Sequence, residues 1–289
     1  MLPAGDQKKT MEEYKVKSDN RILNAFEIYK NTVFTTDTDL SFWKSFLQTS
    51  INNYKANNPT QVGLYEAGFY VYEYSSKHED GHLKGHKISR LIKTDNLEID
   101  KNDFISWISN LATLKIYNAL ENFILQAIHI RYFMENKHAV GSKKATDKLN
   151  IDIKTYLLNH NLKVDTKNNR HIIQFLRSKS SNVTSFLERK MNIDLATKWG
   201  DFFELISILR NVIAHQGTIV SFDTQNEIKS RAKDIFQRHF SLNKDEFGLK
   251  RLQPNNEQYA SFINYFNSFS LHVVQCIFDE DDLKFLGMN

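Results

Sequence analysis

Apolar positions recur at three- and four-residue spacing along most of the chain, which is the period of an amphipathic α-helix. The longest such segment runs from residue 104 to about 136. Further helices are predicted over residues 20–33, 40–54, 151–158, 169–177, 184–191, 194–217, 225–240 and 258–278. We therefore predict an all-α protein with a helical bundle at its core.

One segment fits two periods. Residues 61–75 contain aromatic and β-branched side chains, among them Val62 and Val71, which favour a strand. Leu64, Gly68 and Val71 also fit a helical stripe. Because helices dominate the rest of the chain, we predict a helix here.

A histidine-rich segment follows, with the sequence KHEDGHLKGHK over residues 77–87. His78, His82 and His86 are four residues apart, so on a helix they would share one face and could bind zinc. Gly81 and Gly85 disfavour a helix there, and no cysteine completes a usual ligand set. We predict a polar loop without a metal.

The charged stretch 95–103 reads as a linker between two parts of the chain. We expect residues 1–100 to form an N-terminal helical accessory region. Residues 101–289 are expected to form the main helical bundle domain.

The segment 202–217, FFELISILRNVIAHQG, is an apolar helix whose last turn becomes polar. Asn211 and His215 are four residues apart and share a face. Arg210 stands five residues before His215, about 140° around the axis, and both side chains are long enough to converge on one ligand. Gly217 is placed to end the helix in the left-handed conformation. Arginine can bind a phosphate bidentately, and histidine can transfer a proton near neutral pH.

Structural roles are the alternative for each of these residues. His215 in a last turn can cap carbonyls, and Arg210 can be solvated or salt-bridged. Glu121 lies among polar residues in the middle of the predicted helix 104–136. It is either exposed or paired with Lys115, or it faces Arg210 or His215 and orients one of them.

Composition narrows the class of protein. Glycine (10) and proline (3) are scarce among the 289 residues, which favours long helices over a turn-rich β fold. The net charge of +4 permits RNA binding without arguing for it. A single cysteine excludes a disulfide framework within the chain. No apolar stretch approaches the roughly 20 residues that span a bilayer, so we expect a cytoplasmic protein with no membrane partner.

The Arg210–His215 segment resembles the Arg-x4-6-His motif of the HEPN superfamily, a group of all-helical RNases and nucleotide-binding domains. The family often has Asn after the Arg, as here at Asn211. Asn118–Glu121 resembles the family's first core helix, where many members carry an acidic residue. The resemblance covers roughly residue 104 to the C-terminus. One subgroup has a Tyr two residues after the His; Gly217 stands there, so that subgroup's activity is not implied.

The resemblance implies a metal-independent endoribonuclease without a cofactor, with Arg210, His215, Asn211 and Glu121 as its site residues. Expected partners are an RNA substrate and a second copy of the chain in a twofold dimer. An antitoxin or regulatory protein, and a role as a toxin or in anti-phage defence, are implied by the resemblance only. Two alternatives stay open: a non-catalytic module that binds RNA, a nucleotide or a protein, and a purely structural interaction protein.

Overall fold

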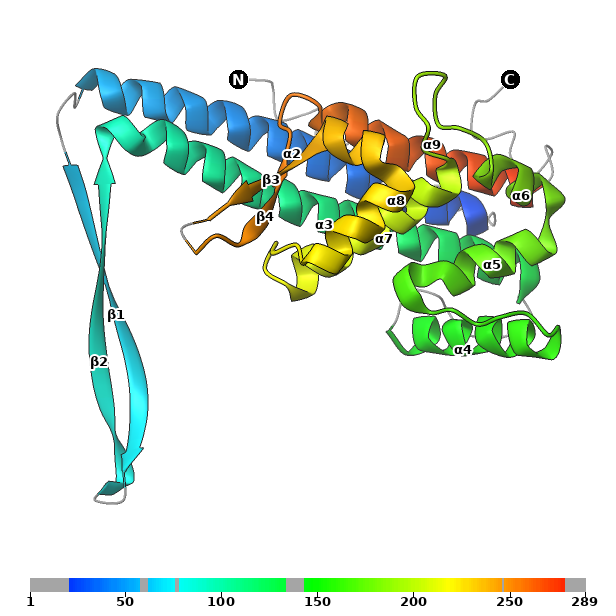
Figure 1. Ribbon diagram of the computed structural model, residues 1–289, viewed down its shortest axis with the longest axis horizontal. Helices are drawn as coiled ribbons and strands as arrows, with labels where there is room; N and C mark the ends of the chain where they lie inside the picture. The colour runs from blue at the N-terminus through cyan, green and yellow to red at the C-terminus, as the bar shows by residue number, and fades with distance from the viewer. Residues whose placement is uncertain (1–20, 58–61, 76–77, 134–142, 246, 279–289) are drawn as a thin grey trace, which may run out of the picture. The chain divides into compact units, whose positions relative to one another are not determined.

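Figure 1 shows the computed structural model, which describes residues 21–57, 62–75, 78–133, 143–245 and 247–278. Within these ranges the chain forms eight α-helices, two short 3-10 helices and two β-hairpins. The helices are α2 (Arg21–Asn57), α3 (Leu97–Tyr132), α4 (Lys143–Asn159), α5 (Arg170–Lys179), α6 (Ser181–Leu187), α7 (Trp199–His215), α8 (Phe222–His239) and α9 (Tyr259–Ile277). The 3-10 helices are η1 (Thr94–Asn96) and η2 (Lys167–Asn169). The strands are β1 (Val62–Ser75), β2 (His78–Lys93), β3 (Phe240–Lys244) and β4 (Lys250–Pro254). The predicted all-α class is confirmed.

The chain divides into two compact units. One takes the described parts of residues 1–38 and 109–289, and the other takes residues 39–108. Both α2 and α3 contribute to both units, so the division differs from a single boundary near residue 100. Within the first unit, Tyr29 of α2 stacks on Phe123 of α3 with ring centroids 5.2 Å apart. This contact joins residues far apart in sequence. The position of a charged stretch along the chain cannot predict such a contact.

Aromatic side chains form the core of the larger unit. Phe202 and Phe203 of α7 are completely buried, and Phe203 stacks on Phe269 of α9 at 5.1 Å between ring centroids. Phe202 also meets Phe262 and Phe266 of α9 edge-on. Each buried aromatic side chain removes roughly 150–250 Å² from water, so this layer anchors α7 against α9. The polar last turn of α7 is thereby held at a fixed place.

Helix α2 is continuous where two helices and a link over residues 35–39 were expected, so that prediction was wrong. The threonines in this stretch return their hydroxyls to the preceding turn: Thr35 donates to the carbonyl of Asn31 at 2.7 Å, and Thr36 to that of Thr32 at 2.6 Å. No glycine or proline interrupts the segment, so the polar side chains are accommodated within the helix.

The predicted helix over residues 61–75 was also wrong, because this segment is strand β1. It pairs antiparallel with β2, from Val62 opposite Lys93 to Ser75 opposite His78. A polar loop was predicted over residues 77–87, and the described part of it, residues 78–87, belongs to β2 instead. Aromatic and β-branched residues favour the strand, and the glycines that weaken a helix do not prevent a hairpin. The side chains of His78, His82 and His86 lie outside what the structure describes.

A second hairpin lies between α8 and α9. Strands β3 and β4 pair antiparallel, with Leu242 opposite Leu252. The connection after α7 joins this hairpin, because the backbone N–H of Leu252 donates to the carbonyl of Thr218 at 2.8 Å. None of the described helices is both long enough and apolar enough to cross a membrane.

Candidate functional site

The candidate site is built on the last turns of α7. Leu205, Ile206 and Leu209 are buried at 0–1% exposure, so the apolar face of the helix is fixed in the core. Arg210 and Asn211 are half-buried, and His215 is exposed. Gly217 adopts φ of 57°, which confirms the predicted left-handed end of the helix.

Arg210 and His215 converge as their reach predicted. The Arg210 Nη1 atom lies 3.3 Å from Nε2 of His215 and donates to Oδ1 of Asn211 at 2.9 Å. A guanidinium can only donate hydrogen bonds, so Nε2 accepts in this contact and carries no proton. The Nε2 lone pair therefore faces the guanidinium of Arg210 in this arrangement.

Asn211 positions Arg210 instead of His215. While its Oδ1 accepts from Arg210, its Nδ2 donates to Oδ1 of Asn168 at 3.2 Å. Asn168 is buried, and its own Nδ2 donates to Oε1 of Glu227 on α8 at 3.1 Å. A chain of side chains from η2 and α8 thus fixes the amide that holds Arg210.

Asn168 and Asn169 share an unusual backbone conformation. Both residues are left-handed, with φ of 51° and 57°. Asparagine tolerates this region better than most residues, although consecutive left-handed residues still cost conformational energy. The turn directs the two adjacent amides to different partners, Asn168 to Glu227 and Asn169 to Glu121. The two adjacent asparagines are a sequence signal for such a turn. Its role in the site was not predicted from the sequence.

Glu121 of α3 is half-buried and faces Asn169 rather than Lys115. It accepts hydrogen bonds from Asn169 Nδ2 and, at 3.5 Å, from the hydroxyl of Tyr117. Burial raises the pKa of the Glu121 carboxyl, against the opposing effects of the Asn169 bond and the positive charge of Arg210. Glu121 is therefore close enough to Arg210 to act on it through charge, but it makes no ion pair with it.

Arg210 has no ion pair with any described carboxylate. Its buried Nε also has no hydrogen-bond partner within the described part of the chain. A buried guanidinium N–H without a partner is costly, and an anionic oxygen is the ligand that best satisfies it. The end of α7 can therefore bind an anion beside an imidazole able to accept a proton.

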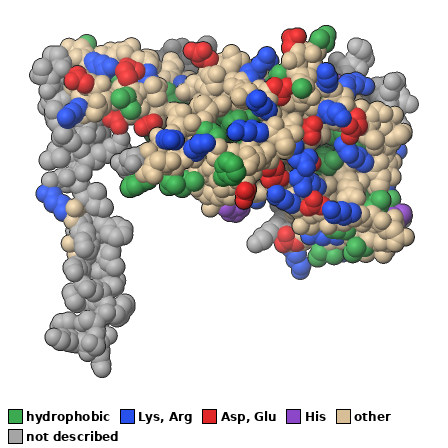
Figure 2. Space-filling model, in the orientation of Figure 1, with side chains coloured by type: hydrophobic (Ala, Val, Ile, Leu, Met, Phe, Trp, Pro, Cys, Tyr) green, Lys and Arg blue, Asp and Glu red, His purple; other side chains and the backbone are tan. Residues whose placement is uncertain are grey.

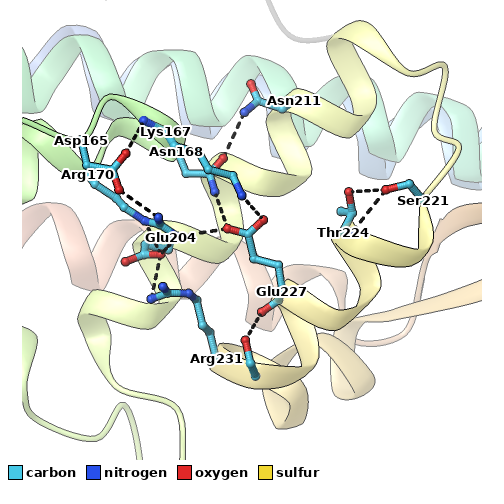
Figure 3. A network of polar contacts seen from close by, with 11 residues as sticks. Asp165, Lys167, Asn168, Arg170, Glu204, Asn211, Ser221, Thr224, Glu227 and Arg231 are labelled. Atoms are coloured by element: carbon cyan, nitrogen blue, oxygen red, sulfur yellow. Dashed lines mark hydrogen bonds and ion pairs between the residues drawn. The ribbon is translucent and has the colours of Figure 1, made fainter.

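A second set of charges surrounds the first half of α7 (Figure 3). Arg170 is paired with Asp165 at 3.0 Å, with Glu204 at 2.9 Å and with Glu227 at 3.0 Å. Arg231 also reaches Glu204, at 2.9 Å. The hydrogen bond from Arg170 lowers the pKa of Asp165. Sequence reasoning missed this network, because its members come from four separated segments without a common period.

The described residues contain no cluster of three or more His, Cys, Asp or Glu side chains able to hold a metal ion. The three histidines at 78, 82 and 86 fall outside that search. Nothing in the arrangement around Arg210 and His215 uses a metal ligand set.

Comparison of the chain with protein-family models, with curated proteins and with solved structures gave no significant match. The resemblance to the HEPN superfamily thus stays a prediction, which rests on the motif at residues 210–215 and its helical context.

Proposed function

We propose that the protein is a metal-independent endoribonuclease whose site is formed by Arg210 and His215. The observation that carries this proposal is their contact of 3.3 Å at the open end of α7, with Arg210 unpaired by any described carboxylate. A fixed cation next to an imidazole suits cleavage of a phosphodiester, in which charge develops on phosphate oxygens.

The chemistry uses the 2′-hydroxyl of RNA as nucleophile. His215 takes the proton of the 2′-hydroxyl, the 2′ oxygen bonds to phosphorus, and the bond to the 5′ oxygen of the next nucleotide breaks. The leaving oxygen takes up a proton from an acid. Arg210 binds the phosphate and stabilises its charge, and Asn211 holds Arg210 in place. The products are a 2′,3′-cyclic phosphate and a 5′-hydroxyl.

One chain supplies only one such imidazole, whereas the reaction needs a base and an acid. Two copies related by a twofold axis would place the partner subunit's His215 opposite, one acting as base and the other as acid. We therefore propose a homodimer with both Arg210–His215 pairs at its interface. A role in toxin action or anti-phage defence fits this chemistry and rests on the resemblance to the HEPN superfamily.

The test is cleavage of a mixed RNA in EDTA by wild type, Arg210→Ala and His215→Ala. Loss of one acid–base group or one charge-stabilising group costs about 10²- to 10³-fold in rate. His160→Ala is the matched control, because His160 is exposed just after α4, where its side chain contacts the carbonyl and the ring of Tyr156. Equal cleavage by wild type and both site variants would refute the assignment.

Oligomeric state provides an independent test. Sedimentation at micromolar concentration is expected to show a dimer, and active protein that sediments as a monomer would refute the two-copy site. RNA binding without any cyclic-phosphate product would favour the alternative, a non-catalytic binding module that uses the same two residues.

A further inference from the structure

Five aromatic side chains are exposed on the part of the smaller unit that α2 and α3 build, and we call them the aromatic patch. They are Phe42, Trp43 and Phe46 of α2 and Phe104 and Trp107 of α3, each 45–60% exposed. All five belong to the unit of residues 39–108. A group of large apolar side chains left in water marks a contact surface.

Within each helix the rings contact one another. Phe46 stacks on Phe42 at 6.2 Å between ring centroids and meets Trp43 edge-on at 5.7 Å. On α3, the rings of Phe104 and Trp107 are 5.7 Å apart. These contacts restrict the rings before any partner arrives, so less side-chain entropy is lost on binding.

Two side-chain contacts fix how α2 and α3 run past each other in this unit. Nζ of Lys101 on α3 donates to Oε1 of Gln48 on α2 at 2.6 Å, and Nζ of Lys55 lies 3.1 Å from Oε1 of Glu98. As the residue number rises along α2 it falls along α3, so the two helices are antiparallel.

The two groups of rings are level with each other along the helix pair. At 1.5 Å per residue, Phe46 and Phe104 lie about 3 and 4.5 Å past the Lys101 contact in the same direction. Trp43 and Trp107 lie about 7.5 and 9 Å past it.

The rings also lie on one side of the pair. Ile51 of α2 and Ile105 of α3 are buried and share the stripes that make the two contacts. Trp43 is about 80° around the axis from Ile51 and Phe104 about 100° from Ile105, in the same rotational sense of each helix. In an antiparallel pair such rotations lead to the same side, so the rings of both helices form one surface.

The size of the patch fits one side of a protein interface. An enclosed aromatic side chain removes roughly 150–250 Å² from water, so five that are half exposed present roughly 400–650 Å². A stable interface takes about 800 Å² from each partner, with an apolar core and a polar rim. The patch is therefore large enough to form the core of such an interface.

The charges near the patch disfavour a nucleic acid as its partner. Residues 39–57 and 97–108 carry three lysines and four carboxylates, a net charge of −1. Figure 2 shows acidic and basic side chains interspersed over the end of the α2–α3 pair, on the left of the view. Surfaces that stack single-stranded RNA on aromatic rings combine the rings with a positively charged groove. A nearly neutral surface suits another protein surface better.

A second copy of the chain is the partner that this geometry fits. An interface about a twofold axis needs a surface that is complementary to itself. Two antiparallel helices side by side present ridges and grooves that a half-turn about the axis between them leaves nearly unchanged. The same pair from a second copy can therefore pack on them as in a four-helix bundle.

We propose that the aromatic patch joins two copies of the chain, with the α2–α3 pair of one copy packed on that of the other. None of the five residues belongs to the Arg210–His215 site, so the inference goes beyond the proposed ribonuclease function. It holds whether or not the protein cleaves RNA.

The test is sedimentation velocity of the full chain across micromolar concentrations. Wild type is expected to change from monomer to dimer as the concentration rises. Phe46→Ser should raise the dissociation constant of the dimer about 30-fold or more, as a hot-spot side chain at the centre of an interface does. Phe222→Ser is the matched control, because Phe222 is an exposed phenylalanine of α8 outside the patch. Circular dichroism checks that both variants fold.

Tryptophan fluorescence gives a second readout. Of the three tryptophans, Trp43 and Trp107 lie in the patch, and Trp199 is buried in the larger unit. Dilution of wild type should shift the emission to the red as the two patch rings meet water. Phe46→Ser should show the red-shifted emission at every concentration. A dimer whose emission does not change on dissociation would have its interface elsewhere, which would overturn the assignment.

Three further results would overturn the proposal. Wild type that stays a monomer throughout would exclude association through the patch. A dimer that Phe46→Ser and Trp107→Ser leave unchanged would be joined by another surface. Loss of RNA binding in these variants, with association unchanged, would identify the patch as a base-stacking surface. Cleavage in EDTA tests Arg210 and His215 alone, so the two proposals can fail separately.

Discussion

The arginines beside the two halves of α7 have different partners. Near Glu204, both Arg170 and Arg231 are neutralised by carboxylates within 3.0 Å. Further along the helix, the hydrogen bonds of Arg210 to described residues go to an amide and an imidazole. At the first half of α7 the arginines have carboxylate partners. At its end Arg210 has no carboxylate partner among the described residues.

This difference separates arginines that hold the fold from one that is available to a ligand. Arg170 ties the segment before α5 to α7 and α8, and its three partners are each less than one-third exposed. Removing it takes an ion-pair partner from all three carboxylates: among the described residues Asp165 keeps none, whereas Glu204 keeps Arg231 and Glu227 keeps Lys167. Removing Arg210 strands none and eliminates a buried Nε that has no described partner. Stability and activity should therefore respond in opposite order to the two substitutions.

Arg170→Ala is expected to give the largest loss of stability. Breaking a buried ion pair by removing one partner costs about 3–5 kcal/mol, and partial solvent exposure reduces this to about 2–3 kcal/mol here. Arg210→Ala should lower the free energy of unfolding by less than about 1 kcal/mol. Urea unfolding followed by circular dichroism measures both. Equal losses for the two variants would contradict the division of α7 into a structural and a binding half.

The apolar pattern was enough to predict the helices that hold both regions. The helix at 258–278 and the motif helix exist close to the predicted limits, because large buried side chains at a 3.6-residue period dominate the local signal. The helix predicted from residue 104 begins at Leu97, so the linker predicted over residues 95–103 was wrong. The convergence of Arg210 and His215 also followed from spacing and reach. These are properties of one helix, which sequence alone can specify.

What was missed depends on partners distant in sequence or on backbone geometry. The strand at Val62–Ser75 fitted both periods, and only its pairing with β2 decides between them. The left-handed pair Asn168–Asn169 leaves no periodic signal. The partners of Arg170 lie up to 57 residues away, so no local pattern could join them.

The comparison extends to two histidines that differ in solvent exposure. His171 of α5 is 4% exposed; its Nε2 lies 3.0 Å from Oδ1 of Asn150, and its Nδ1 has no partner within the described residues. Burial, with a smaller effect from Lys154, lowers the pKa of His171 to about 4. His215, in contrast, is exposed at the candidate site.

Acid should therefore unfold the protein partly through His171. Its folded pKa lies below the unfolded value, so the unfolded state binds more protons and stability falls as pH drops from about 6.5 towards 4. Between pH 7 and pH 5 the loss from this group is about 2 kcal/mol. Urea unfolding at the two pH values measures it. His171→Gln should flatten the dependence, and a slope equal to that of the wild type would rule out this cause.

The smallest effect expected concerns the turn that ends α7. Gly217 and Gly248 both have positive φ, 57° and 76°, and a Cβ at either position would meet nothing within 4 Å. Alanine therefore brings only backbone strain, about 1 kcal/mol at each site. Thermal unfolding should show similar losses for Gly217→Ala and Gly248→Ala. RNA cleavage should separate them, because Gly217 follows the exposed His215 by two residues and sets the backbone that ends its helix, while Gly248 lies in the loop between β3 and β4. Cleavage reduced equally in both variants would mean that lost stability, and not the placement of His215, accounts for the change.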